Sequence, residues 1–217
     1  MHLEFLVEDQ SGKAMLERLI PKLLNGTHTF SIHSYKGIGR IPKGLSPKSD
    51  PNKRILLDNL PRLLRGYGQT FAGYGAGYRA AVVVVCDLDE RNFASFTKEL
   101  LETAAKANPR PPTEFCIAVE EGEAWFLGDR AAVLAAYPKA KKAVLDDYKQ
   151  DSICGTWERL ADAVHSGGSA ALAAQGYQVV GAEKSRWAEN ITPHMDPAAN
   201  LSPSFKKLCA ALRNVIL

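Results

Sequence analysis

Two aspartates separated by a single residue are the strongest candidates for chemistry in this chain. Asp87 and Asp89 follow the apolar run 80–86, and residues two apart in an extended segment point to the same side. Both carboxylates can therefore face one cation, and hard oxygen ligands favour Mg²⁺ or Mn²⁺ over zinc. The alternative is that Asp89 and Glu90 cap the helix that follows. The spacing favours a divalent-metal site built on Asp87 and Asp89.

Acidic residues also follow two other strand-like runs, at 2–7 and 113–119. In chain order, the acids at the three run ends are Glu8 and Asp9, then Asp87, Asp89 and Glu90, then Glu120, Glu121 and Glu123. The carboxyl ends of parallel strands meet at one edge of a sheet, where ligands bind. Acids gathered there would repel one another unless a cation neutralised them or their pKa values rose. We therefore expect a three-strand acidic site, and the sequence leaves open which of the last three acids faces the metal.

The elements that must position these acids alternate between strand and helix. Strands are expected at 2–7, 27–34, 80–86 and 113–119, and helices at 12–24, 52–65 and 92–107. The valine run 82–85 is continuous rather than alternating, which is typical of a strand covered on both faces. This order predicts an α/β fold with a mostly parallel, Rossmann-like sheet flanked by helices.

Local signals set the expected ends of these helices. Ser11 is expected to cap the first helix, and Pro21 to kink it or end it near Ile20. Pro61 argues for a break in the second helix. The glycine-rich stretch 66–77 precedes a strand instead of joining a strand to a helix, so we expect a connector and not a dinucleotide-binding loop.

Beyond residue 131 the chain is rich in alanine and in helical patterns. Its last helix is marked by Ser202 as the cap and Pro203 at the first helical position. Trp125 and Trp187 lie at apolar-periodic positions, so we expect both to be buried by packing. The sequence thus predicts an α/β core at 1–130 and a helical C-terminal extension at 131–217 that packs on the core.

The composition is that of a globular protein, with 46% hydrophobic and 24% charged residues. No apolar run approaches the roughly 18 residues of a membrane-spanning helix. The N-terminus has no basic region leading into an apolar stretch, so we expect a cytoplasmic protein with no membrane partner. The four cysteines are dispersed, which favours buried, reduced thiols over a zinc site or disulfides.

The segment 36–65 concentrates positive charge. Its basic residues are Lys36, Arg40, Lys43, Lys48, Lys53, Arg54, Arg62 and Arg65, against only Asp50 and Asp58. A basic segment beside a carboxylate cluster fits a nucleic acid, because cations hold phosphates that an acidic site would otherwise repel. Lys36, Arg40 and Lys43 would then contact the substrate backbone, joined by Lys184 if the C-terminal extension folds over the sheet edge. A solvated, lysine-rich surface loop explains the same segment equally well.

The order of strand, Glu8, helix and a later strand ending in Asp87-Leu88-Asp89 resembles the Toprim arrangement of topoisomerases, primases and OLD-type nucleases. More of the chain resembles an uncharacterised bacterial branch of Toprim-like proteins. The matching segments are LVEDQSG at 6–12, DLD at 87–89, EGEAWFLGD at 121–129, KSRW at 184–187 and NLSPSF at 200–205. These segments extend from the first strand to the last helix, so the resemblance covers nearly the whole chain.

The resemblance implies a Mg²⁺-dependent nuclease, or a related phosphodiesterase, in bacterial defence or DNA processing. Asp87 and Asp89 would hold the metal, Glu8 would be a ligand or the general acid–base group, and Glu121 or Glu123 would complete the shell. Related proteins often work beside an ATPase. Because this chain has no Walker motif of its own, the resemblance also suggests an ATPase partner.

One position departs from the pattern of that family. OLD-type nucleases often carry a further glutamate shortly after the first, where this chain has Ser11 and Gly12. The departure favours a rival hypothesis, a catalytically inactive metal- or nucleic-acid-binding module that partners an ATPase. A third hypothesis is a phosphatase- or nucleotidyl-type enzyme that uses the same carboxylates on a small phosphorylated substrate.

Overall fold

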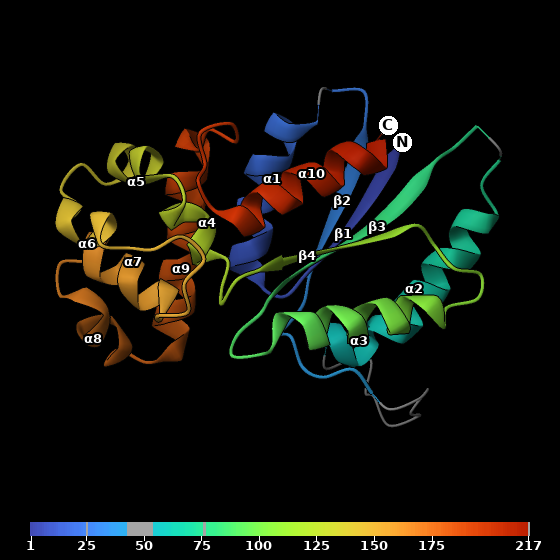
Figure 1. Cartoon of the computed structure of the whole chain (residues 1–217), viewed down its shortest axis with the longest axis horizontal. Coiled ribbons are helices and arrows are strands. Elements are labelled where there is room, and N and C mark those ends of the chain that lie inside the picture. The colour runs from blue at the N-terminus through green and yellow to red at the C-terminus, as the bar shows by residue number, and fades with distance from the viewer. Residues whose placement is uncertain (25, 43–53, 76, 217) are drawn as a thin grey trace.

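A four-stranded sheet organises the protein (Figure 1). The computed structural model describes residues 1–24, 26–42, 54–75 and 77–216. All strands are parallel and lie in the order β2-β1-β3-β4, with β1 at His2–Val7, β2 at Thr29–Ser34, β3 at Ala80–Asp87 and β4 at Thr113–Ala118. This arrangement confirms the predicted α/β fold with a parallel, Rossmann-like sheet.

Helices cover both faces of the sheet (Figure 1). One face carries α1 (Gln10–Leu23) and α10 (Pro203–Ile216), and the other carries α2 (Leu56–Ala72) and α3 (Phe93–Ala105). In β3, Val83 packs into the core beneath α1 and α10, whereas Val84 packs into the core beneath α2 and α3. The valine run is thus buried on both faces, as its continuous pattern predicts.

The strand order places a topological switch point between β1 and β3. From β1 the chain crosses first to β2 on one side and later to β3 on the other, so the loops that follow β1 and β3 diverge. Ligands of open α/β sheets bind in the crevice outside such strand ends. The register aligns Val7 with Val85, so Glu8 and Asp87 lie close together where the two strands end.

The first helix begins differently from the prediction. Asp9, not Ser11, is the capping residue: its backbone is extended, and its carboxylate accepts a 2.7 Å hydrogen bond from the Gly12 amide. Ser11 lies inside the helix and donates its hydroxyl to the same carboxylate at 2.7 Å. The helix also continues past Pro21 to Leu23, because the proline removes only one amide donor and the Leu24 amide still bonds to Ile20.

The second helix is longer than expected and includes both Pro61 and part of the glycine-rich stretch. It extends to Ala72, so the prediction of a connector over 66–77 is wrong for its first seven residues. A side-chain carbon at Gly68 would lie 1.9 Å from the Pro109 carbonyl oxygen. Glycine is therefore needed here for close packing of a helix against a neighbouring segment, and not for a turn.

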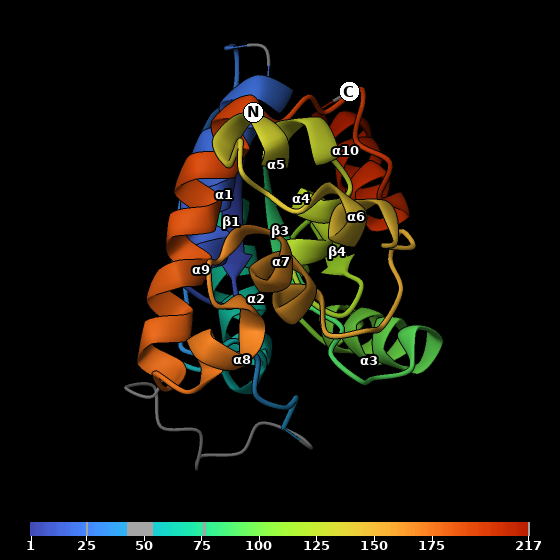
Figure 2. The ribbon, with the colours of Figure 1, turned by 90° about the vertical axis from the view of Figure 1, so that its left-hand side faces the viewer.

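The helices between β4 and α10 gather at the carboxyl end of the sheet (Figures 1 and 2). They are α4 (Glu123–Leu127), α5 (Arg130–Ala136), α6 (Lys142–Asp146), α7 (Thr156–Val164), α8 (Gly168–Ala173) and α9 (Tyr177–Ile191), followed by the 3-10 turn η2 (Thr192–His194). α9 packs along α1, and α10 then returns to the sheet beside β4. Within the described ranges, no helix is long and apolar enough to cross a membrane.

Two of the segments that carry the Toprim resemblance pack against each other. Trp125 is fully buried, its indole N–H donates to Ser204 Oγ at 2.9 Å, and its carbonyl oxygen accepts from Asn200 Nδ2 at 2.7 Å. Ser202 Oγ accepts from the Phe205 amide at 3.2 Å, which confirms Ser202 as a cap of α10. The segments at 121–129 and 200–205 therefore join α4 to α10, and Trp125 has the packing role expected of it.

Candidate functional site

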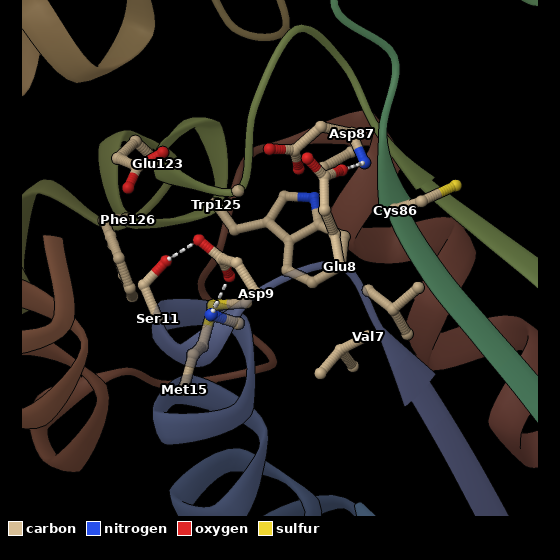
Figure 3. A pocket seen from close by; sticks show the side chains of 14 residues that line it. Val7, Glu8, Asp9, Ser11, Met15, Cys86, Asp87, Glu123, Trp125 and Phe126 are labelled. Carbon is tan, nitrogen blue, oxygen red and sulfur yellow. Dashed lines mark hydrogen bonds between the residues drawn. The ribbon is translucent and has the colours of Figure 1, made fainter. Parts of the chain in front are cut away.

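A small cavity lies at the switch point, where β1 and β3 end beneath α4 (Figure 3). Its volume is about 30 Å³, which is room for a water molecule or two, or for one small cation. The acids that line it are Glu8, Asp9, Asp87 and Glu123. Apolar side chains, among them Val7, Met15, Trp125 and Phe126, form much of the remaining wall. The cavity thus holds several acids against a largely apolar surround.

Glu8 and Asp87 form the centre of this arrangement. Their carboxylates point toward one another in Figure 3, and the Asp87 amide donates to Glu8 Oε2 at 3.3 Å. Burial raises the pKa of Glu8 to about 7, against the lowering effect of the Asp87 amide, and the charge of Asp89 raises it further. Burial, followed by the charge of Glu8, raises the pKa of Asp87 well above its usual value. Without a cation, the ionisation of both groups together is therefore disfavoured near neutral pH.

Glu123 occupies the same cavity but has a cation of its own. Its side chain is 3% exposed, and its Oε2 lies 3.2 Å from Lys184 Nζ, which reaches in from α9. Burial raises the pKa of Glu123 to about 7, although Lys184 lowers it. Burial also acts to lower the pKa of Lys184, but the charges of Glu123 and Glu121 outweigh this effect and raise it. Lys184 is therefore a permanently charged part of the site, and it contacts carboxylates there.

Asp89 is not brought into the cavity. β3 ends at Asp87, and Asp89 adopts a left-handed backbone with φ of 50°, so the two aspartates are not in the extended geometry that the spacing suggested. The Asp89 side chain is 45% exposed and pairs with Arg91 at 2.9 Å. Arg91 also donates to the carbonyl oxygen of Gly39 at 3.2 Å. Asp89 and Arg91 therefore connect the end of β3 to the loop that follows β2.

The structure separates the three glutamates at the end of β4. The Glu120 carboxylate accepts from the amides of residues 154, 155 and 156 at 3.1, 2.8 and 2.9 Å, and so caps the start of α7. Glu121 accepts from the Thr156 hydroxyl and the Trp157 amide, both at 3.3 Å, and its Oε1 lies 3.4 Å from Lys184 Nζ. Only Glu123, of the three, lines the cavity.

The basic residues expected to bind a polyanion divide between described and undescribed parts of the chain. Lys36 and Arg40 are exposed in the loop after β2, and the neighbouring Gly37 amide donates to the Glu8 carbonyl oxygen at 3.0 Å. Both therefore lie on the loop that hydrogen-bonds to the backbone of Glu8. Lys43 lies outside the described residues.

Two residues have roles that the sequence did not predict. Asp9 was grouped with Glu8 as one acidic strand end, yet it caps α1 while also lining the cavity. Arg91 was not considered, although a guanidinium two residues after Asp89 is a natural partner for that carboxylate. The short spacing of Asp89 and Arg91 could have indicated their ion pair.

The donor set fits one divalent ion better than two. Within residues 1–24, 26–42, 54–75 and 77–216, no group of three or more His, Cys, Asp or Glu side chains is arranged to hold a metal. Glu8 and Asp87 nevertheless offer two hard oxygen ligands side by side, and Mg²⁺ commonly binds through one or two carboxylates with water and phosphate oxygens completing its shell. Asp89 is directed elsewhere, and Glu121 and Glu123 are paired with Lys184.

Comparison with known proteins places the chain in a family. No curated protein and no solved structure matches this chain. The family described as "Domain of unknown function (DUF4276)" matches residues 7–213, a range that includes every acidic residue of the site and Lys184. The chain therefore belongs to the DUF4276 family.

Proposed function

We propose that this protein is a Mg²⁺-dependent phosphodiesterase, most simply a nuclease, that works with a single metal ion. The observation that carries the proposal is the facing pair of Glu8 and Asp87 at the switch point of a parallel sheet. Pairs of acids with strongly raised pKa values in a cleft are typical of functional sites. The same two strand ends carry the early glutamate and the first aspartate of the Toprim arrangement that the sequence resembles.

Each residue has a defined task in this proposal. Glu8 and Asp87 would hold the ion, which when bound would polarise the phosphate and stabilise the charge that develops on it. Glu123, with its pKa of about 7, would take the proton from the attacking water as the phosphorus–oxygen ester bond breaks, and the proton would then pass to the leaving oxygen. Lys184 would orient Glu123 and offset part of the negative charge of the acids around the phosphate.

The surroundings support the same chemistry. Met15, Trp125 and Phe126 keep much of the cavity wall apolar, which strengthens electrostatic interactions inside it. Lys36 and Arg40 would hold the phosphate backbone of a nucleic acid as it approaches the acidic edge. A cytoplasmic location and an ATPase partner also belong to this proposal, and they rest on the sequence alone.

A binding module without turnover is the second candidate, and a specific observation favours it. Lys184 already pairs with Glu121 and Glu123, Arg91 pairs with Asp89, and Asp9 caps α1. Of the described acids that line the cavity, Glu8 and Asp87 are therefore left for an ion. Such a site could bind Mg²⁺ together with a phosphate and yet hydrolyse nothing.

A cleavage assay separates the two candidates. Pure protein is incubated with single- and double-stranded DNA and RNA in Mg²⁺ or Mn²⁺, in parallel with the variants Asp87→Asn and Asp89→Asn. We expect Asp87→Asn to lower cleavage at least 100-fold and Asp89→Asn to lower it less than tenfold. Equal cleavage by Asp87→Asn would refute the enzyme, whereas calorimetric binding of Mg²⁺ and oligonucleotide without any cleavage would establish the binding module.

A further inference from the structure

A groove at the opposite end of the sheet has no part in the chemistry proposed above. Its volume is about 520 Å³, and it lies where β1 and β3 begin, between the end of α2, the segment 109–112 and the end of α10. In Figure 1 this end of the sheet lies on the right-hand side of the molecule, away from α4 to α9. The volume falls within the roughly 300–1,000 Å³ of typical small-ligand sites.

Aromatic side chains line up along the end of α2 and continue to this groove. Ring centroids are 5.6 Å apart for Tyr67 and Phe71, 5.7 Å for Phe71 and Tyr74, and 4.8 Å for Tyr74 and Tyr78. Phe71 and Tyr78 line the groove. Tyr74 and Tyr78 are 37% and 51% exposed, so their rings are open to a partner. Adjacent exposed rings of this kind provide stacking surfaces for planar groups.

One wall of the groove is tightly packed. α2 approaches the segment 109–112 so closely at Gly68 that any larger residue would collide with the Pro109 carbonyl oxygen. Pro109, Pro111 and Pro112 all line the groove. The wall is therefore formed by proline-rich backbone held against a helix, which favours a groove that exists before a ligand binds.

The charge of the groove favours an anion. Arg79 and Arg110 line it, and Arg110 is exposed. Arg79 also donates to the Val215 carbonyl oxygen at 3.4 Å, which ties it to the end of α10. Glu114 also lines the groove, and burial raises the pKa of its carboxyl. The exposed Arg110 guanidinium, close to exposed aromatic rings, matches the alternation of phosphates and bases in a nucleic-acid strand.

We propose that this groove binds single-stranded nucleic acid, with bases stacked on Tyr74 and Tyr78 and a phosphate on Arg110. A proline-rich peptide would also find aromatic rings here, but it would give the exposed Arg110 guanidinium no anion to bind. β3 extends from Ala80 at this end to Asp87 at the other, roughly 23 Å apart at the rise of a strand. The groove is therefore separate from the carboxylate cavity and does not depend on any catalysis there.

Binding can be measured without metal, so that turnover plays no part. Fluorescence anisotropy of labelled dT12 and rU12 is recorded in EDTA with the full chain. The protein carries Lys36→Ala and Arg40→Ala, so that these basic residues near the carboxylate cavity do not contribute to binding. We expect Tyr78→Ala to raise the Kd at least fivefold and Tyr78→Phe, which keeps the ring, to change it less than twofold. Arg110→Gln should lower the slope of log K against log salt by about 0.7, the loss of one phosphate contact.

Two further variants make the result specific. Tyr177 is 84% exposed on α9, so Tyr177→Ala is a matched control that should leave the Kd unchanged. Asp87→Asn should also bind normally, which separates this inference from the proposed function. Circular dichroism and urea unfolding check that each variant folds. Three outcomes would overturn the proposal. The protein binds neither oligonucleotide, or Tyr78→Ala and Tyr177→Ala have equal Kd values. In the third outcome, a proline-rich peptide binds in a Tyr78-dependent way in place of the oligonucleotides.

Discussion

The acids at the carboxyl edge form two pairs that differ in how their charge is balanced. Glu121 and Glu123 share Lys184, at 3.4 and 3.2 Å, so a cation is built into that half of the site. In the described part of the chain, no ion pair forms at Glu8 or Asp87, and burial raises both pKa values. A buried acid pair with its own ammonium can serve as a joint between elements, whereas a pair without one calls for protons or an external cation.

The largest expected effect on stability comes from removing the Lys184 ammonium group. Lys184→Met would leave Glu121 and Glu123 without a charge partner, and we expect a loss of about 3 kcal/mol in the free energy of unfolding at pH 8. Urea denaturation measures it. The loss should shrink at pH 5.5, because Glu123 can then be protonated.

An exposed lysine provides the control for that experiment. Lys13 pairs with Glu17 at 3.7 Å on the surface of α1, where both side chains are 35% or more exposed. Lys13→Met should therefore cost less than about 0.5 kcal/mol. If Lys184→Met is as mild as Lys13→Met, the contrast between the two acid pairs disappears.

The second effect concerns the pair without a cation and follows from the raised pKa of Glu8. The pKa of Glu8 is about 7 in the folded protein, against 4.5 for an ordinary glutamate. At pH values between these two, the folded protein keeps a proton that the unfolded chain has already lost. Stability without metal should therefore fall as the pH rises from 4.5 through 7, by roughly 2–3 kcal/mol for this group. Urea unfolding in EDTA across this range tests the slope.

Glu8→Gln should reduce that pH dependence, because the amide does not titrate, and the raised pKa values of Asp87 and Glu123 should keep part of it. Glu17→Gln, on the exposed surface of α1, should leave it unchanged. A stability that rises with pH over the same range in the wild-type protein would contradict the assignment of a raised pKa to this pair.

The third effect is stabilisation by metal. At 10 mM Mg²⁺ and a Kd of the order of 1 mM, we expect the free energy of unfolding to rise by about 1.4 kcal/mol at pH 8. The gain should be smaller at pH 5.5, because protons compete for the carboxylates. Thermal unfolding with and without Mg²⁺ measures it. The gain should vanish in Asp87→Asn.

The smallest effect sharpens the role of Asp89. Its side chain is 45% exposed, and its left-handed backbone is one that asparagine adopts readily. Asp89→Asn should therefore change the free energy of unfolding by less than about 0.5 kcal/mol and keep the stabilisation by Mg²⁺. Loss of the Mg²⁺ effect in this variant would place Asp89 among the metal ligands, as the spacing of the two aspartates first suggested.

Several differences between the sequence-based predictions and the structure share one cause, which is that local patterns do not report distant contacts. Pro21 was expected to kink α1 or end it near Ile20, yet Lys22 in the last turn donates to the carbonyl oxygens of Thr192, Pro193 and Met195. Gly68 lies in the stretch predicted to be a connector, yet it is helical and packs directly against Pro109. In both places a contact with a remote segment accompanies the helix that local propensity argued against.

The sequence by itself determined the parallel sheet, the helices on both its faces and the placement of acids at three strand ends, because hydrophobic periodicity and strand direction are local properties. Only the tertiary structure decided which acids meet. Glu120 binds the start of α7 more than 30 residues away, Asp89 turns toward Arg91, and Glu123 meets Lys184 from α9. The direction of a side chain at the end of a strand depends on the path of the loop and on the elements that pack over it. For this reason the spacing of Asp87 and Asp89 predicted a pair, whereas the fold places Asp87 beside Glu8.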